Sequence, residues 1–276
     1  MKRLPAVLAL LLASLLLFAA CDVQKLQPPG PFRLAPYKKG DGSLDGAALH
    51  GGGEMQTKTL ALPETPERFS LEVAAGISFR KSGRIEADII IDESLAERSV
   101  VLEADGNIAE AIELSYDEGL GKIKVSTKRQ TLLTGPANIQ IRIGAPVKRL
   151  TVNGSWKVTY DCPSVTNCDI TINGAANGDF TFGTLKSLEL NINGAGACSL
   201  FGAAHEAEIE IDGAASVEAF ELIAQEAAVE INGAGSCTIT AEQKLKIDLS
   251  GVGTVTYAGD PELKQDIHGV GTVRKK

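Results

Sequence analysis

A glycine returns every 18 to 20 residues through the second half of the chain, each time after a short alternating segment such as Ile-Thr-Ile-Asn. The repeated glycines are Gly154, Gly174, Gly194, Gly213, Gly233, Gly251 and Gly269. A steady period of this length is typical of a stacked repeat architecture. Within each copy the apolar residues alternate, which is the period of a strand and not of a helix. We therefore expect each copy to form one coil of a solenoid built from strands.

Two positions of the repeat stay small or apolar in all seven copies, which predicts that both face a shared interior. The residue two before the glycine is in turn Val152, Ile172, Ile192, Ile211, Ile231, Leu249 and Ile267. The residue four after it is Val158, Gly178, Cys198, Val217, Cys237, Val255 and Val273. Two or three short strands per copy, with a corner at the glycine where a positive φ is expected, describe one coil of a parallel β-helix. Neighbouring coils would lie about 4.8 Å apart.

The preceding part of the chain, residues 57–146, is expected to be a β-rich N-terminal half that caps the first coil of the repeat half, residues 147–276. Turn signals at Asp105-Gly106 and Asp117-Glu118-Gly119 separate its segments, and a short helix is expected over Asn107–Ile112. Alternating or apolar runs predict strands at Ser70–Val73, Ile77–Phe79, Ala87–Ile91, Val100–Ala104, Ile123–Val125 and Ile139–Ile143.

The repeated Ile-Asn-Gly pattern, together with upstream segments such as Phe69–Val73 and Lys122–Val125, resembles the DUF2807 family, the head GIN domain of auto-transporter adhesins. The resemblance extends over about residues 57–273. It implies an all-β fold with a right-handed parallel β-helix of about seven coils, and the general crossover rule favours the same hand. The family has no defined catalytic motif, so the resemblance says little about activity and implies no catalytic residue and no cofactor.

The first 20 residues have the pattern of a signal peptide. Met1-Lys2-Arg3 is positively charged, and the 16 residues from Pro5 to Ala20 carry no charge. This run is shorter than the roughly 20 residues that span a bilayer, and its layout is that of a secretory signal. The ending Phe18-Ala19-Ala20-Cys21 resembles the lipobox of bacterial lipoproteins, which implies cleavage before Cys21 and lipidation of its sulfur and new amine. The alternative is an ordinary cleaved signal that leaves Cys21 as a free thiol.

Residues 21–56 are predicted to be a tether between this anchor and the folded part. The segment contains Pro28, Pro29, Pro31 and Pro36, and it ends near the triplet Gly51-Gly52-Gly53. Such composition is typical of a spacer that is first semi-extended and then flexible. Several acyl chains on one residue would hold the chain firmly to a membrane. We therefore expect an exported, membrane-anchored protein of the bacterial cell envelope, facing the periplasm or the cell surface.

The formal charge is −8, from 27 Lys and Arg against 35 Asp and Glu. Nucleic-acid binders need a surplus of basic side chains to neutralise phosphates, so this balance excludes that class of function. Among candidate chemical groups, the three histidines lie at His50, His205 and His268, and none has a motif that would form a nucleophile–base pair. Trp156 is compatible with stacking on a sugar or with covering the core of the first coil.

The asparagines that precede the repeat glycines are predicted to form a stacked ladder at the turns. The residue three before the glycine, which should point outward, is in turn Thr151, Thr171, Asn191, Glu210, Glu230, Asp248 and Asp266. Four carboxylates would therefore stack on consecutive coils, where like charges repel. Three interpretations remain open: a solvated acidic face, a stripe that binds calcium or a cationic partner, or paired carboxylates for glycosidic cleavage, which would also need a cleft.

The five cysteines divide into three groups. Cys21 belongs to the predicted anchor. Cys198 and Cys237 occupy the inward position two coils apart, so their Cα atoms should be roughly 9–10 Å from each other, too far for a disulfide. Cys162 and Cys168 flank a connection in which an envelope location permits a disulfide, with a buried thiol as the alternative for Cys168. No histidine lies at metal-ligand spacing from any of them, which argues against zinc.

These observations favour a lipid-anchored, non-enzymatic envelope protein that displays an adhesin-like β-helix. The expected ligand is a polysaccharide or another envelope protein. One alternative is a structural or assembly role in the envelope, for which a homo-oligomer is compatible with the sequence. A polysaccharide-degrading β-helix enzyme is a further alternative, and it rests on architecture alone.

Overall fold

The computed structural model describes residues 48–49, 51–64, 69–74, 85–95, 97–127, 132–133 and 137–276, which belong to one compact unit, Leu44–Lys276. The predicted signal peptide, Cys21, most of the predicted tether, His50 and the predicted strand over residues 77–79 lie outside the described residues. Within the described ranges, no helix has the length and apolar character needed to cross a membrane.

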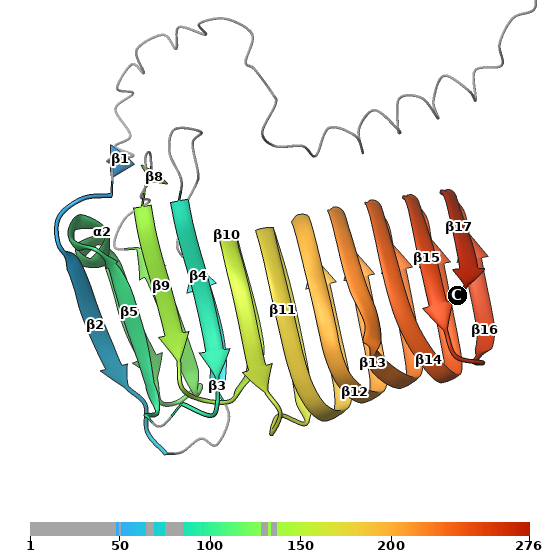
Figure 1. The fold of residues 1–276 in the computed structure, drawn as a ribbon, viewed down its shortest axis with the longest axis horizontal. Helices are drawn as coiled ribbons and strands as arrows, with labels where there is room; N and C mark the ends of the chain where they lie inside the picture. Colours follow the sequence, from blue (N-terminus) through green and yellow to red (C-terminus); the bar gives the residue numbers. More distant parts are fainter. Residues whose placement is uncertain are drawn as a thin grey trace, which may run out of the picture. The chain divides into compact units, whose positions relative to one another are not determined.

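The repeat half is a parallel β-helix, as the glycine period predicts (Figure 1). Long strands bend around the corners and pair in parallel with the next coil, one repeat further along the chain: Val152 pairs with Ile172, and Ile192 pairs with Ile211. The strands are β10 (Val147–Cys162), β11 (Asn167–Ile192), β12 (Ala195–Ile211), β13 (Ala214–Ile231), β14 (Ala234–Leu249), β15 (Val252–Ala258), β16 (Glu262–Ile267) and β17 (Val270–Lys275).

Each coil contributes one strand segment before its repeat glycine and one after it, and these segments build two faces of the solenoid. We call the layer of segments before the glycines, from Val147–Val152 in β10 to Glu262–Ile267 in β16, the first face. The layer of segments after the glycines, from Lys157–Cys162 in β10 to Val270–Lys275 in β17, is the second face. Because side chains alternate along a strand, every second residue of each face points into the interior between the faces.

The N-terminal half extends the same two layers before closing them. The strands β3 (Phe69–Ala74) and β4 (Ile85–Asp92) pair in parallel with the two segments of β10. The strands β7 (Lys122–Thr127) and β9 (Ala137–Ile143) pair in parallel with β3 and β4 in turn. The coil next to β10, formed by β3 and β4, therefore comes first in the sequence, and the more distant coil, formed by β7 and β9, comes later. This half is not only a cap on the first coil, because it adds coils to the solenoid itself.

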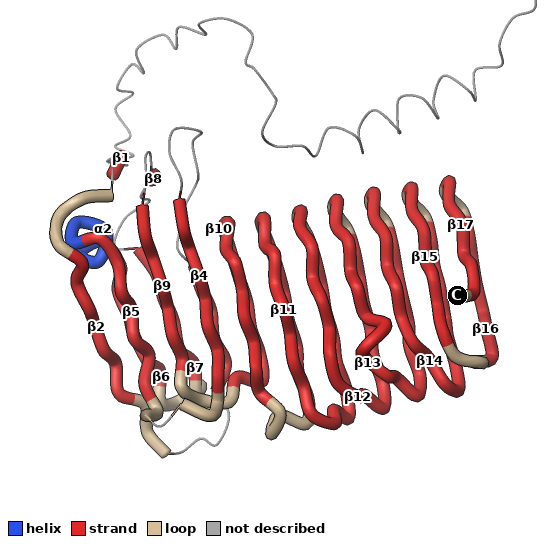
Figure 2. Tube along the Cα trace, in the orientation of Figure 1, coloured by secondary structure: helices blue, strands red, loops and turns tan. Residues whose placement is uncertain are grey.

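Antiparallel strands close the N-terminal end (Figure 2). On one side β5 (Ser99–Asp105) pairs with β9, and β2 (Met55–Ala61) pairs with β5; on the other, β6 (Ile112–Asp117) pairs with β7. The helix α2 (Gly106–Ala111) links β5 to β6 and agrees with the predicted helix to within one residue. A further short pair joins β1 (Ala48–Leu49) to β8 (Leu132–Leu133). The sequence patterns missed β2 and β6, whose outward residues are mostly exposed.

One hydrophobic core runs through the solenoid and continues into the N-terminal half. Aliphatic side chains from consecutive coils stack in columns, and the predicted inward positions are buried from the first coil to the sixth. An aromatic cluster lies early in the repeat half, where Tyr160 packs against Phe180 and Phe182 with ring centroids 6.0 and 5.4 Å away. Trp156 is also buried, at 3% exposure, and its indole nitrogen donates to the carbonyl of Asn153.

The repeat glycines are needed because the backbones approach closely at this corner. A Cβ added to any of the six glycines from Gly174 to Gly269 would clash with the carbonyl oxygen of the glycine one coil earlier. Of the seven repeat glycines, all in the described part of the chain, only Gly154 has a positive φ, of 105°. The expectation that the corner needs a positive φ is therefore wrong for the other six. Close stacking of the turns, and not backbone handedness, selects glycine there.

The asparagines before these glycines form the predicted ladder. The amide of Asn173 donates to Oδ1 of Asn153 at 3.1 Å, and Asn193 donates to Asn173 at 3.0 Å. Asn153 in turn donates to the carbonyl of Val73, which extends the ladder to β3 in the N-terminal half. These bonds satisfy side-chain amides along the stack, so the column has a structural role at the turns.

Candidate functional site: a charged groove on the first face

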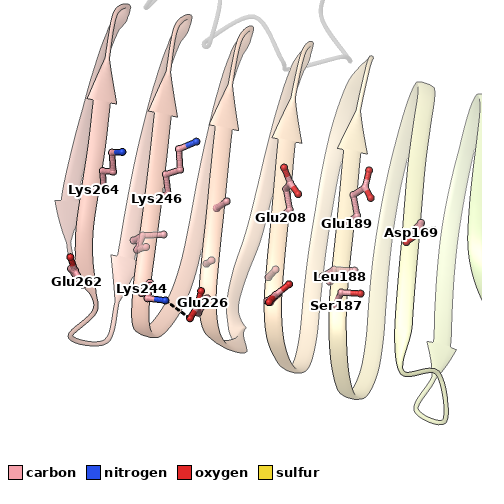
Figure 3. A pocket seen from close by; sticks show the side chains of 15 residues that line it. Asp169, Ser187, Leu188, Glu189, Glu208, Glu226, Lys244, Lys246, Glu262 and Lys264 are labelled. Carbon is pink, nitrogen blue, oxygen red and sulfur yellow. Dashed lines mark hydrogen bonds and ion pairs between the residues drawn. The ribbon is translucent and has the colours of Figure 1, made fainter.

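The first face carries a shallow groove of about 500 Å³ that runs along the solenoid axis across the coils of β11 to β16 (Figure 3). Two outward columns and the inward column between them line it. The residues five before the repeat glycine are Asp169, Glu189, Glu208, Ala228, Lys246 and Lys264. The residues seven before it are Ser187, Glu206, Glu226, Lys244 and Glu262. The small or apolar floor is formed by Leu188, Ala207, Ala227 and Leu245.

Strand alternation places these side chains. In each coil the residue six before the glycine points inward and joins the core, so its two neighbours must both point out. Parallel pairing then brings equivalent residues side by side, as in the pairs Glu189–Glu208 and Lys246–Lys264. The groove is therefore a direct consequence of the repeat, and its chemistry is set by which residues occupy two columns.

Charge divides the groove along its length. Carboxylates predominate on β11 to β13, and the three lysines lie on β14 and β16 together with one carboxylate, Glu262 (Figure 3). At the boundary, Nζ of Lys244 lies 2.7 Å from Oε1 of Glu226. The hydrogen bond and charge of Glu226 raise the pKa of Lys244. At the N-terminal end, Arg149 neutralises Asp169 with an ion pair of 2.9 Å. The carboxylates between these two pairs dominate the middle of the groove.

The four predicted outward carboxylates do stack on consecutive coils. Glu210 pairs in register with Glu230, Glu230 with Asp248, and Asp248 with Asp266. This column runs beside the groove and does not line it. Burial raises the pKa of Glu210, and the nearby charges of Asp212, Glu230, Glu208 and Glu189 raise it further.

Neighbouring side chains satisfy several members of this column. Glu230 accepts the amide of Asn232 at 2.8 Å, Asp248 accepts the hydroxyl of Ser250 at 3.3 Å, and Nε2 of His268 lies 3.1 Å from Asp266. Across the described ranges, no three His, Cys, Asp or Glu side chains converge on a point where they could hold a metal ion. A row of carboxylates spaced by coils differs from the convergent oxygen cage that calcium uses.

The structure places Cys162 and Cys168 in the interior, each as a free thiol. Of the two possibilities that the sequence left open, this is the buried thiol at Cys168 and not the disulfide between the two cysteines. The hydroxyl of Tyr160 lies 3.3 Å from Sγ of Cys168 and donates to the carbonyl of Val147 at 2.6 Å. Burial raises the pKa of both thiols to about 12. Cys198 and Cys237 are also buried and free, with Val217 between them in the same column, as predicted.

Trp156 has no face available to a sugar because the ring is buried in the core, so that alternative is wrong. The residues of this candidate site that sequence reasoning missed are the groove-lining Glu189, Glu206, Glu226 and Lys244. The sequence did contain a signal for these residues. The positions five and seven before each glycine flank an inward position, so both are expected to point outward. Only the pairing between coils shows that these two columns enclose a hollow.

Solved structures of proteins from Parabacteroides and Bacteroides have a similar fold. A "putative adhesin" from Parabacteroides merdae is 20% identical with a TM-score of 0.56, and the match covers 83% of this chain and 99% of that one. A "putative adhesin" from Bacteroides fragilis is 17% identical with a TM-score of 0.59, covering 83% and 100%. A "putative lipid binding protein" from Parabacteroides distasonis is 19% identical with a TM-score of 0.53, covering 83% and 100%. At these identities the likeness shows the fold alone.

No protein with curated annotation matches the chain. The model of one family, described as "Putative auto-transporter adhesin, head GIN domain", matches residues 81–261. This range spans most of the β-helix and includes the whole groove apart from its last two residues, Glu262 and Lys264. The chain therefore belongs to the DUF2807 family of adhesin-like β-helical domains.

Proposed function

We propose that this chain is an exported bacterial envelope protein, anchored by lipid on Cys21, whose β-helix is a non-enzymatic binding domain. The tether of residues 21–56 would hold the β-helix away from the membrane. The charged groove on the first face carries the proposal. Its length along the solenoid axis suits an extended polymer, and its charged rims offer ion pairs and hydrogen bonds.

The ligand we propose is a polysaccharide chain, with a segment of an envelope protein as the alternative of the same extended shape. Sugar rings would lie over the strand backbone at Leu188, Ala207, Ala227 and Leu245, whose side chains point into the core. Amino or hydroxyl groups of the polymer would donate to Glu189, Glu206 and Glu208, and anionic or hydroxyl groups would bind Lys246. Binding spread over many weak contacts suits an adhesive surface.

The experiment is co-sedimentation of the chain with a panel of insoluble envelope polysaccharides, with and without calcium. The chain is expressed with its own leader and carries Cys21→Ser, so that lipid does not contribute to retention. The groove variant Glu189→Gln/Glu206→Gln/Glu208→Gln should lose retention at least fivefold. The control Asp179→Asn/Glu218→Gln changes exposed carboxylates on the second face and should retain binding.

Polymer length is measured in the same tubes. Equal retention of the groove variant and the unchanged chain would place binding elsewhere and overturn the role of the groove. Shortened polymer would contradict the non-enzymatic proposal and direct attention to the column from Glu210 to Asp266. Retention that requires calcium, and that fails in Glu210→Gln/Glu230→Gln, would assign a cation to that column. Absence of retention on every polymer would favour the protein ligand or the assembly role.

A further inference from the structure

The last coil differs from every other coil of the repeat half because its two strands have a neighbour on one side only. The strand β16 pairs with β14, and β17 pairs with β15, and no other described strand pairs with either of them. Both strands therefore present a row of backbone N–H and C=O groups at one end of the solenoid (Figure 1). Such an edge is a template for pairing with another chain.

The core is also open at this end. Ile267 occupies the inward column two before the glycine, whose six earlier members are at most 1% exposed, yet Ile267 is 39% exposed. Leu263 and Val273 lie in inward columns that are buried in the preceding coils, and both remain only partly buried. An apolar strip of the core is thus left uncovered along the edge strands, beside their free hydrogen-bonding groups.

The strand β16 reads Glu-Leu-Lys-Gln-Asp-Ile and is followed by His268. This sequence can pair favourably with a second copy of itself that runs in the opposite direction. If a second copy runs antiparallel with Gln265 opposite Gln265, then Lys264 lies opposite Asp266 and Leu263 lies opposite Ile267. Glu262 lies opposite His268 in the same register. Residues directly opposite in an antiparallel pair point to the same side. The ion pairs therefore fall on the outer surface, and the apolar pairs fall on the core side.

We propose that two copies of this chain join end to end through an antiparallel β16–β16 pair, about a two-fold axis at Gln265. Each contact in this register occurs twice by symmetry, except at the axis itself, where the two Gln265 amides can bond each other. The pairing would cover Leu263 and Ile267 of both copies and would saturate the edge groups of β16. A two-fold interface is closed, so it yields a dimer and not a filament.

Charges within one copy favour this pairing. In the parallel ladder Lys264 stands beside Lys246, and Asp266 stands beside Asp248, so these two edge charges each have a like charge as their ladder neighbour. Within the same copy, Asp266 also lies 3.1 Å from Nε2 of His268. Like charges in directly neighbouring ladder positions destabilise a sheet, and opposite charges stabilise it. The proposed register gives Lys264 and Asp266 of each copy an opposite charge on the other copy.

The strand β17 is compatible with the same axis. Thr272 and Gln265 lie equally far along the chain from the turn at His268–Gly269. They therefore occupy similar positions along the strand direction, Gln265 on the first face and Thr272 on the second. A two-fold axis through Gln265 would therefore bring Thr272 opposite Thr272 and Gly271 opposite Val273. Threonine pairs across strands are favourable, and the backbone of Gly271 would cover Val273. Both faces of the solenoid would then continue through the dimer.

The test is sedimentation equilibrium of the full chain carrying Cys21→Ser, expressed with its own leader, over a range of concentrations. We expect a monomer–dimer equilibrium. Lys264→Asp and Asp266→Lys should each raise the dimer dissociation constant roughly tenfold or more, because two cross-copy attractions become repulsions. Each introduced charge would stand beside an opposite charge of the preceding coil, Lys246 in the first case and Asp248 in the second. This neighbour compensates the fold for the lost side chain, including the contact of Asp266 with His268.

The decisive variant is the charge exchange Lys264→Asp/Asp266→Lys. By symmetry it restores both cross-copy ion pairs, so its dissociation constant should return to within about threefold of the unchanged chain. The control Lys246→Asp lies one coil inward in the same column and should leave the dimer intact. Four results would each overturn the proposal. They are a monomer at every concentration, a dimer whose dissociation constant does not change in the single variants, a double variant that dimerises as weakly as the single variants, and open-ended oligomers. None of these results depends on whether the groove binds a polysaccharide.

Discussion

Glu226 and Lys244 form an ion pair between neighbouring coils, with Oε1 of Glu226 2.7 Å from Nζ of Lys244. They occupy equivalent positions of consecutive repeats, and the pair marks the coil boundary at which the groove changes from acidic to basic. The repeat thus keeps the backbone constant from coil to coil while single substitutions set the charge of the groove.

Removing this pair should weaken the fold slightly and in a salt-dependent way. Lys244→Met leaves Glu226 without its partner beside Glu206, so we expect a small drop in the unfolding midpoint at low ionic strength. At about 1 M salt the Debye length falls to about 3 Å and the difference should shrink. Thermal unfolding at both salt concentrations measures it, with Lys157→Met on the second face as the control. A drop of the same size at both salt concentrations would mean that packing, and not charge, is responsible.

Replacing a repeat glycine should be strongly destabilising. In Gly213→Ala the added methyl group would collide with the carbonyl oxygen of Gly194, and neither backbone can move without disturbing the coil ladder. We expect a loss of about 3 kcal/mol in the free energy of unfolding. Denaturant titration measures it. Gly119→Ala is the matched control, because the added Cβ there meets only the carboxylate of Asp117 at 3.4 Å. Equal effects at the two sites would contradict the close-stacking explanation.

Glu210 should make stability fall as pH rises. The pKa of Glu210 is raised in the folded chain, by burial first and then by neighbouring carboxylates, so the folded state holds the proton more tightly than the unfolded state. The stabilisation that Glu210 contributes is therefore complete when the pH is below its pKa in the unfolded chain. It is lost as the pH rises through its pKa in the folded chain. Glu210→Gln should be more stable than the unchanged chain at about pH 7 and equal to it near about pH 3.

Urea titrations at the two pH values measure this difference, and Glu113→Gln on the exposed side of β6 is the control. A variant that is less stable than the unchanged chain at neutral pH would show that Glu210 is held by a favourable partner, such as a bound cation, and not by repulsion.

The cysteines of the β-helix should be unreactive while the chain is folded. Burial raises the pKa of Cys162, Cys168, Cys198 and Cys237 to about 12, so the thiolate that reacts with a disulfide reagent is scarce and enclosed. In the chain carrying Cys21→Ser, we expect negligible reaction under native conditions and four reactive thiols after unfolding in guanidinium. Two reactive thiols after unfolding would instead establish the disulfide between Cys162 and Cys168.

The sequence by itself determines the solenoid, because the inward positions and the turn glycines recur at one period. Val152 and Ile172 can be assigned to one column from spacing alone, and the same spacing predicts the asparagine ladder and the stack from Glu210 to Asp266. The exposed strand β2 was missed, since its residues show no clear apolar alternation. The order of β3 and β7 in the stack could not be predicted either, because it depends on pairing between segments distant in the chain.

Only the tertiary structure decided which surface columns act together. Spacing alone says that Glu206 and Glu208 point outward, and it does not say that the surface between them is hollow or that Lys244 closes the acidic stretch. Likewise, the composition of β16 becomes informative only once β16 is known to be an edge strand beside a partly open core. A repeat period fixes local geometry, whereas a groove or an edge arises from how coils stack and where the stack stops.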